Sequence, residues 1–269
     1  MALIDCHFHS DVLGRASSML VLLPQRARTQ IGLECAGAGA GAGSGRRLYP
    51  VLYLLHGLSD DHTIWTRRTS IERYVAGLEL IVVMPNGDRG FYTDHEAGPR
   101  YWTMLSEELP ALVADMFPAS TRREDTFAAG LSMGGYGALK LALRCPDRYA
   151  AAVGLSSVAD VRQWLDMQPQ DPERKRIFGG ADRLAERGND LFALAESAVR
   201  SATPPRLLQV CGTEDGLYQG NVRFREHLRS LSYPGYEYRE GPGTHNWAFW
   251  DTWIQAGLQF LCGGSQKQG

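Results

Sequence analysis

The sequence predicts an α/β fold in which a mostly parallel central sheet carries helices on both faces. Short apolar runs bounded by glycine, proline or polar residues are typical of buried strands. A strand, a glycine-rich serine turn and a helix follow one another directly at 126–143. Helical patterns accompany the strands, and this mixture favours a layered α/β domain over an all-helical or all-strand one. The expected central strands are 50–55, 80–84, 126–129, 149–155, 206–212 and 236–240.

The remaining segments complete the expected order. We expect antiparallel edge strands at 4–8 and 19–23, helices at 105–116 and 136–143, and a final helix after residue 247. The low-complexity run at 36–45 contains only Gly, Ala and one Ser, which favours a flexible hairpin loop. Residues 1–269 are long enough for a single domain with a large core. The polar stretch at about 157–203 has helical patches such as 191–199, and we interpret it as a small cap-like insertion.

The composition narrows the class of protein. With 28 basic and 30 acidic side chains, the charge indicates affinity for neither nucleic acid nor an anionic membrane. Five cysteines without a C-x-x-C pair argue against a disulfide framework, and Cys145 and Cys211 are expected to be buried. The start lacks the features of a signal peptide, and no apolar run approaches a membrane span, so we expect a cytoplasmic protein. Whether the chain forms a homo-oligomer stays open.

Ser132 is the first candidate catalytic residue. It lies in Gly130-Leu-Ser-Met-Gly134, the G-x-S-x-G pattern of a nucleophile elbow, between an expected strand and an expected helix. Glycines two residues before and after the serine remove Cβ atoms that would clash in so tight a turn. The alternative is an ordinary glycine-rich turn with a capping serine. The strand and helix on either side favour the nucleophile.

Two later loops supply a candidate acid and a candidate base. Asp215 follows the expected strand 206–212, and His245 lies in a loop before the final helix. The order Ser132, Asp215, His245 is that of alpha/beta-hydrolases and differs from chymotrypsin and subtilisin. Glu214 is a rival acid, and Asp215 could serve only the turn. His227 is a rival base, but it lies in a charged stretch that predicts an exposed helix.

The oxyanion hole is expected to use two backbone N–H groups. One belongs to Met133, the residue after the nucleophile, and the other to the loop after the third strand, where Leu58 is our candidate. His56 precedes that loop, and we expect it to brace the loop by hydrogen bonding. No metal or cofactor is expected, and the expected partner is a small-molecule ester. Three aromatic residues near these loops are candidates for the substrate pocket: Trp65, Tyr92 and Trp247.

These motifs together resemble the esterase D-like family of alpha/beta-hydrolases, most closely its tributyrin-esterase branch. The resemblance rests on segments spread from about residue 5 to 262, namely Tyr53-Leu-Leu-His-Gly57, Phe91-Tyr-Thr-Asp94, Glu107-Glu-Leu-Pro110, Gly130-Leu-Ser-Met-Gly-Gly-Tyr-Gly-Ala138, Cys211-Gly-Thr-Glu-Asp215 and His245-Asn-Trp247. It implies a carboxylesterase that hydrolyses short acyl esters through an acyl-enzyme and needs no cofactor. Feruloyl and acetylxylan esterases and S-formylglutathione hydrolases are relatives, and remain alternatives. S-formylglutathione hydrolases typically carry a cysteine where this chain has Ser59.

Two further alternatives belong to other classes. His7 and His9 resemble the His-x-His metal strand of amidohydrolase barrels, because alternate strand residues share a face. Such barrels need later histidine ligands, and none of the seven histidines lies between 95 and 227. The competing interpretation is one face of an exposed edge strand. Some hydrolase folds have become binding modules, usually by losing the nucleophile or base. Here all three residue types are present, which favours an enzyme.

Overall fold

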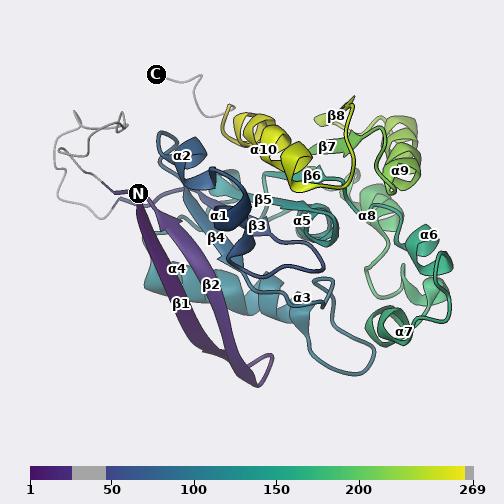
Figure 1. The fold of residues 1–269 in the computed structure, drawn as a ribbon, viewed down its shortest axis with the longest axis horizontal. Coiled ribbons are helices and arrows are strands. Elements are labelled where there is room, and N and C mark those ends of the chain that lie inside the picture. Colours follow the sequence, from purple (N-terminus) through teal and green to yellow (C-terminus); the bar gives the residue numbers. More distant parts are fainter. Residues whose placement is uncertain (26–46, 264–269) are drawn as a thin grey trace.

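The computed structural model describes residues 1–25 and 47–263 (Figure 1). An eight-stranded sheet forms the centre, in the order β1-β2-β4-β3-β5-β6-β7-β8. The strands β3 to β8 run parallel, whereas β2 is antiparallel to both of its neighbours. Their bounds are β1 Ala2–Ser10, β2 Arg15–Leu23, β3 Val51–Leu55, β4 Ile81–Pro85, β5 Thr126–Leu131, β6 Ala151–Leu155, β7 Arg206–Gly212 and β8 Tyr236–Gly241. The predicted α/β fold is confirmed, including the antiparallel edge hairpin.

Helices cover both faces of the sheet. The helices are α1 Ile64–Arg68, α2 Ile71–Val75, α3 Tyr101–Thr103, the π-helix η1 Met104–Glu108, α4 Leu109–Met116, the short η2 Arg123–Asp125, α5 Met133–Arg144, α6 Val161–Asp166, α7 Pro172–Phe178, the short η3 Ala181–Arg183, α8 Leu191–Ala198, α9 Tyr218–Ser230 and α10 Trp247–Cys262. Side chains of α1, α2 and α10 form one apolar core with Leu52 and Leu54. Side chains of α4, α5, α8 and α9 form the other with Tyr53 and Leu55. Alternate residues of β3 therefore enter opposite cores, as the pleat requires.

Several element bounds differ from expectation. The nucleophile strand continues to Leu131, and α5 begins at Met133 rather than Tyr136, so that strand and helix meet directly at Ser132. The helix expected at 105–116 starts four residues earlier, at Tyr101, and contains a π-helical turn. The Gly/Ala run at 36–45 lies outside the described residues. Within the described ranges, none of the helices combines the length and apolar character needed to cross a bilayer.

The insertion between β6 and β7 contains α6, α7, η3 and α8. It packs against the nucleophile helix, because Tyr136 Oη donates to the Asn189 carbonyl at 2.9 Å and Lys140 Nζ donates to Asn189 Oδ1 at 2.7 Å. It also contacts the loop after β4, where Arg89 forms two bonds of 2.8 and 2.7 Å with the Glu173 carboxylate. Figure 1 shows these helices at the end of the molecule next to α5 and α9. That the insertion caps the catalytic residues stays a prediction.

Candidate active site

Ser132 occupies a strained turn between β5 and α5. Its φ of 54° and ψ of −117° are unusual for a residue with a side chain and are typical of strain held at functional sites. The Ser132 N–H donates to the Leu155 carbonyl at 2.8 Å, which anchors the turn to β6. A Cβ atom on Gly134 would lie only 2.3 Å from the Leu55 carbonyl oxygen and 2.6 Å from that of His56. The turn can approach β3 this closely only because residue 134 is glycine.

Asp215 lies in the turn after β7, and its side chain is fully buried. Besides His245, its Oδ1 accepts a hydrogen bond from the Leu217 N–H at 2.8 Å. Burial alone would raise the pKa of Asp215, but the hydrogen bond and charge of His245, with the Leu217 N–H bond, outweigh it. The pKa of the carboxyl group therefore lies below its ordinary value, and the group is an anion at neutral pH.

His245 lies between the serine and the aspartate. Its Nε2 is 3.0 Å from Ser132 Oγ, and its Nδ1 is 2.8 and 3.1 Å from the two oxygens of Asp215. An imidazole protonated on Nδ1 would donate to Asp215 and accept from Ser132, which is the arrangement a general base needs. The three predicted residues thus form one hydrogen-bonded series. About a third of the His245 side chain is exposed (35%), so a reactant can approach it from solvent.

Glu214, the rival acid, points elsewhere. Its carboxylate accepts hydrogen bonds from the Gly243 N–H and from Thr213 Oγ1. These bonds hold the pKa of Glu214 below its ordinary value. The neighbouring backbone is also paired across the two loops: the Thr213 N–H donates to the Gly241 carbonyl at 3.0 Å and the Glu214 N–H to that of Gly243 at 3.1 Å. Glu214 therefore joins the loop of the acid to the loop of the histidine.

The approach of these two loops explains a second glycine. A Cβ atom on Gly212 would lie 2.2 Å from the Gly243 carbonyl oxygen, a separation that no side chain tolerates. Because Gly212 has no side chain, the end of β7 can contact Gly243, which lies two residues before His245 in the next loop.

The two candidate oxyanion donors flank Ser132. Met133 is the first residue of α5, and Leu58 follows Gly57, where an added Cβ would lie 3.9 Å from Ser132 Cβ. Within residues 1–25 and 47–263, neither amide donates to a protein carbonyl or side chain. An oxyanion hole requires two such donors beside the attacking group, so this arrangement is compatible with the predicted hole.

His56 braces this loop, as the sequence predicts. Its Nδ1 lies 2.7 Å from the Gly57 carbonyl, and its Nε2 accepts from the Gly87 N–H at 2.9 Å. Burial lowers the pKa of His56, so the ring is neutral and both of its nitrogens are occupied by the backbone. Because neither nitrogen is free, His56 cannot serve as the catalytic base.

Two of the three pocket candidates are wrong as substrate contacts. Trp65 and Tyr92 are both 0% exposed because they are packed within the two apolar cores. Trp65 Nε1 donates to the Leu55 carbonyl at 3.1 Å, and Tyr92 Oη donates to the His56 carbonyl at 3.0 Å. Trp247 is partly exposed at the start of α10, packed edge-on against Trp65. Trp247 alone keeps surface that a substrate could touch.

Three other histidines have partners outside this series of hydrogen bonds. His7 and His9 share the exposed face of β1, with side chains 72% and 65% exposed, as expected for an edge strand. Throughout the described ranges, no three metal-ligating side chains converge. The expectation that His227 is solvated is wrong: its side chain is only 19% exposed, and Nε2 lies 3.1 Å from the Phe192 carbonyl of α8. The insertion covers a face of α9 that looks exposed in the sequence.

Asp60 is a residue near the site that sequence reasoning missed. A Cβ on Gly57 would lie 3.0 Å from Asp60 Oδ2 and 3.9 Å from Ser132 Cβ, so the Asp60 carboxylate and Ser132 flank the same glycine. Partial burial, and to a lesser degree the charge of Asp61, raise the pKa of Asp60, although the Gly57 N–H opposes this. Its position two residues after the proposed oxyanion donor could have revealed it.

Comparison with known proteins identifies the family of this chain. The model of a family described as putative esterase matches residues 42–261. The chain belongs to this family. An acetyl esterase of Caldicellulosiruptor saccharolyticus is 26% identical over 97% of this chain and 98% of that protein. Within the putative esterase family, the chain is thus an esterase D-like alpha/beta-hydrolase and a carboxylic ester hydrolase.

Solved structures place it among the serine hydrolases. FphF, the fluorophosphonate-binding serine hydrolase F of Staphylococcus aureus, is 34% identical, with a TM-score of 0.83 over 97% of this chain and 98% of that chain. The S-formylglutathione hydrolase FrmB of the same organism is also 34% identical, with a TM-score of 0.81 and the same coverage. The chain is therefore a serine esterase.

Proposed function

We propose that this esterase hydrolyses short-chain acyl esters, with Ser132 as nucleophile, His245 as general base and acid, and Asp215 as the group that orients the histidine. The single observation that carries the proposal is the hydrogen-bonded series from Ser132 Oγ through the imidazole to Asp215. The series supports these three residues among all Ser, His and Asp residues of the chain, and the family supports the ester as substrate.

The reaction follows from the positions of the atoms. Ser132 Oγ attacks the ester carbonyl carbon while its proton moves to His245 Nε2. The tetrahedral intermediate breaks its bond to the alcohol oxygen, which takes the proton back from Nε2 and leaves as alcohol. A water then attacks the acyl-Ser132 carbonyl, giving its proton to the same nitrogen, and the acid is released as Ser132 recovers the proton. Asp215 stays ionised throughout and stabilises the imidazolium.

The free N–H groups of Leu58 and Met133 have a role in the same step. Negative charge develops on the carbonyl oxygen as Ser132 attacks, and two fixed donors stabilise it without reorganising. Removing one such donor typically costs about 10²–10³ in kcat. Because both donors are backbone groups, the side chains of Leu58 and Met133 are free to serve packing or substrate contact.

The acetyl esterase relative supports a short acyl group. A thioester is the second candidate, because FrmB, an S-formylglutathione hydrolase, is as similar to this chain as FphF is. A direct comparison of kcat/KM on p-nitrophenyl acetate, methyl ferulate and S-formylglutathione separates the two. We expect the acetate to be the best of the three, and a clear preference for S-formylglutathione would replace the ester by the thioester.

The nucleophile is tested by substitution and labelling. We expect Ser132→Ala to lower kcat by three or more orders of magnitude, on the order of the loss at other triad serines. A fluorophosphonate probe should label the native protein, with the adduct on the peptide that contains Ser132. Labelling on another residue, or near-normal turnover of the alanine variant, would reject the proposed mechanism. The circular dichroism spectrum of the variant serves as the control for folding.

A further inference from the structure

Asn221 connects the segment that holds the nucleophile to the turn that holds the acid. It lies in the first turns of α9 and is 0% exposed. Its side-chain Nδ2 donates one hydrogen bond to the Ser157 carbonyl at 2.8 Å and another to the Leu217 carbonyl at 2.9 Å. Both hydrogens of the amide are therefore used, each on a different segment of the chain.

The Ser157 side of this bridge reaches the nucleophile. The backbone of Ser132 bonds to residues on both sides of Ser157. Its N–H donates to the Leu155 carbonyl at 2.8 Å, and its carbonyl accepts from the Val158 N–H at 3.2 Å. A shift of residues 155–158 would move the backbone of Ser132 with it. The bond from Asn221 to the Ser157 carbonyl fixes the middle of this segment.

The Leu217 side of the bridge reaches the acid. The Leu217 N–H donates to Asp215 Oδ1 at 2.8 Å, and the Tyr218 N–H donates to the Asp215 carbonyl at 2.9 Å. Residue 217 thus holds the carboxylate through its N–H, and its carbonyl accepts from Asn221 twice, from the backbone N–H at 3.1 Å and from Nδ2. The side-chain amide of Asn221 is the group that links this turn to the segment that holds Ser132.

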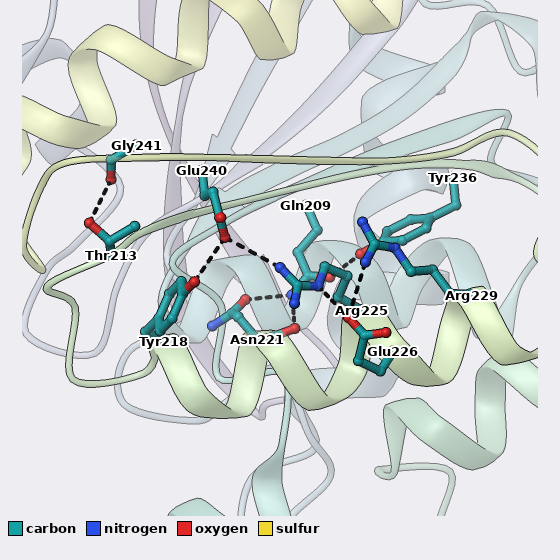
Figure 2. Close-up of polar contacts among 10 residues, drawn as sticks. All are labelled: Gln209, Thr213, Tyr218, Asn221, Arg225, Glu226, Arg229, Tyr236, Glu240 and Gly241. Carbon is teal, nitrogen blue, oxygen red and sulfur yellow. Dashed lines mark hydrogen bonds and ion pairs between the residues drawn. The ribbon is translucent and has the colours of Figure 1, made fainter.

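Two further residues fix which way the Asn221 amide faces. Gln209 Nε2 donates to Asn221 Oδ1 at 2.8 Å and to the Asn221 carbonyl at 2.9 Å, while Tyr236 Oη donates to Gln209 Oε1 at 2.7 Å (Figure 2). Because Oδ1 is already accepting, Nδ2 must face the two carbonyls. Gln209 is also 0% exposed, so this orientation is set within the protein and away from solvent.

We propose that Asn221 is a positioning residue for catalysis: it sets the spacing between the Ser132 turn and the Asp215 turn, so that His245 reaches both. The inference rests on the proposed catalytic roles of these three residues. Asn221 touches no reacting atom, and it acts only by holding residues 157 and 217. A purely structural role would predict a loss of stability without a selective loss of the chemical step.

The main test is Asn221→Asp, which keeps the shape but places a carboxylate oxygen against two carbonyls. We expect kcat on p-nitrophenyl acetate to fall by about 10- to 100-fold, the range expected for a displacement of catalytic groups by a fraction of an ångström to one ångström. KM should change by less than about threefold, because the substrate contacts stay in place. The rate of fluorophosphonate labelling should fall together with kcat.

Tyr74→Phe is the matched control. It removes the hydrogen bond of 2.9 Å from Tyr74 Oη in α2 to Asp251 Oδ1 in α10 and leaves Asn221, Gln209 and Tyr236 unchanged. Its melting temperature should fall, while kcat should stay within about twofold of the wild type. Equal losses of kcat in Tyr74→Phe and Asn221→Asp at equal losses of stability would overturn the inference, as would a change confined to KM.

A second variant and a parallel assay ensure that the experiment gives a clear result. If Asn221→Asp gives no folded protein, Asn221→Ser is used, since its short hydroxyl cannot bond both carbonyls, and labelling is measured on the monodisperse fraction from gel filtration. Ser132→Ala is assayed in parallel. An inactive Ser132→Ala beside a fully active Asn221 variant refutes only the positioning role, whereas an active Ser132→Ala refutes the proposed catalytic function itself.

Discussion

The Lys140 ammonium lies 2.7 Å from Asn189 Oδ1, and both residues are buried. Two further bonds, to the Tyr92 carbonyl at 3.1 Å and to Thr93 Oγ1 at 2.9 Å, complete the three that an ammonium can donate. Lys140 thereby joins the nucleophile helix α5 to the loop after β4 and to the insertion. None of these three acceptors is a carboxylate, and Nζ also lies 4.7 Å from the centroid of the Trp102 ring and 5.5 Å from that of Tyr136.

Lys140→Met should destabilise the protein, because it leaves three buried acceptors without a donor. We expect a loss of about 1–3 kcal/mol in the free energy of unfolding, measured by urea denaturation. Burial, with a smaller contribution from Arg144, holds the pKa of Lys140 well below its ordinary value. The unfolded chain then binds more protons than the folded one between the two pKa values, so stability should rise with pH there.

The control for this prediction is the pH dependence of the variant. The difference in stability between wild type and Lys140→Met should grow in favour of the wild type as pH increases from the folded-state pKa of Lys140 toward its ordinary value. A difference that is constant with pH, or one that shrinks as pH increases, would contradict a depressed pKa at this lysine.

Asp215→Asn should lower kcat by about 10⁴, because the neutral amide favours the wrong histidine tautomer. Glu214→Gln is the comparison one residue away: it keeps only one of the two hydrogen bonds that the carboxylate accepts but removes no group bonded to His245, so its kcat should fall far less than that of Asp215→Asn. Steady-state kinetics on p-nitrophenyl acetate measure kcat for both variants. Equal losses at the two positions would mean that the acid had been misassigned.

The same carboxyl also contributes to stability. Because the folded-state pKa of Asp215 is depressed, its contribution is fully present above the unfolded-state pKa and is lost as pH falls through the folded-state value. Denaturation of wild type and Asp215→Asn between neutral and strongly acidic pH should show the two free energies converging in acid. If the two free energies of unfolding diverged in acid instead, the depressed pKa of Asp215 would be contradicted.

Asp60→Asn should favour substrates that carry a negative charge. The carboxylate beside Gly57 repels an anion bound near Ser132, and a unit charge at this range is worth about 1 kcal/mol or more. We expect kcat/KM on p-nitrophenyl hemisuccinate, relative to neutral p-nitrophenyl butyrate, to increase by about 3- to 10-fold, and the gain to shrink in high salt.

Asp61→Asn removes the same charge one residue farther on and serves as the comparison. The Asp61 carboxylate is bonded to the Thr63 N–H at 2.9 Å and to Thr63 Oγ1 at 2.6 Å. Its loss should leave the substrate ratio nearly unchanged. If both variants shift the ratio equally, the effect comes from net charge rather than from the place of Asp60.

Activity should survive removal of metal ions. His7 and His9 lie on the exposed face of β1, apart from the Ser132–His245–Asp215 series. Dialysis against a chelator, and the double substitution His7→Ala with His9→Ala, should each retain most of the esterase rate. Loss of activity in chelator that returns with a divalent ion would reopen the metal-dependent alternative.

The kcat/KM of the enzyme should depend on the length of the acyl chain and should be high only for short chains. Each methylene that fits a pocket gains about 0.8 kcal/mol of burial, and the gain stops where the pocket ends. We expect kcat/KM to peak at about two to four acyl carbons across p-nitrophenyl esters. We also expect no jump in rate above the solubility limit of the substrate. A maximum at laurate would indicate a lipase-like site.

The local sequence predicted those parts of the site that depend on backbone geometry. Gly130 and Gly134 mark a turn that no other residue allows, and Ser132, Asp215 and His245 each follow a parallel strand that ends at the same edge of the sheet. The side chains that line the site were harder to predict from the sequence. Trp65 and Tyr92 lie close to the motifs in sequence, yet burial of their polar ends removes them from solvent.

Lys140 and Asn221 show why the rest could not be predicted. Lys140 lies within Ala138-Leu-Lys-Leu-Ala142, where a lone lysine in an apolar helix normally reaches solvent. Its acceptors come from residues 92, 93 and 189, and a single sequence does not reveal that these segments meet. The contacts of Asn221 could not be predicted either, because its partners Ser157 and Gln209 are distant from it in the sequence.

The pairing of the acid loop with the histidine loop has an evolutionary consequence. Peptide groups of residues 213 and 214 bond to residues 241 and 243, and the Glu214 carboxylate adds a bond to the Gly243 N–H. Substitutions elsewhere in these loops that keep Gly212, Glu214 and Gly243 therefore leave the bonds between the loops in place. Descendants of this enzyme can exchange the residues that meet the substrate, and so acquire new substrates, without having to rebuild the machinery that cleaves the bond.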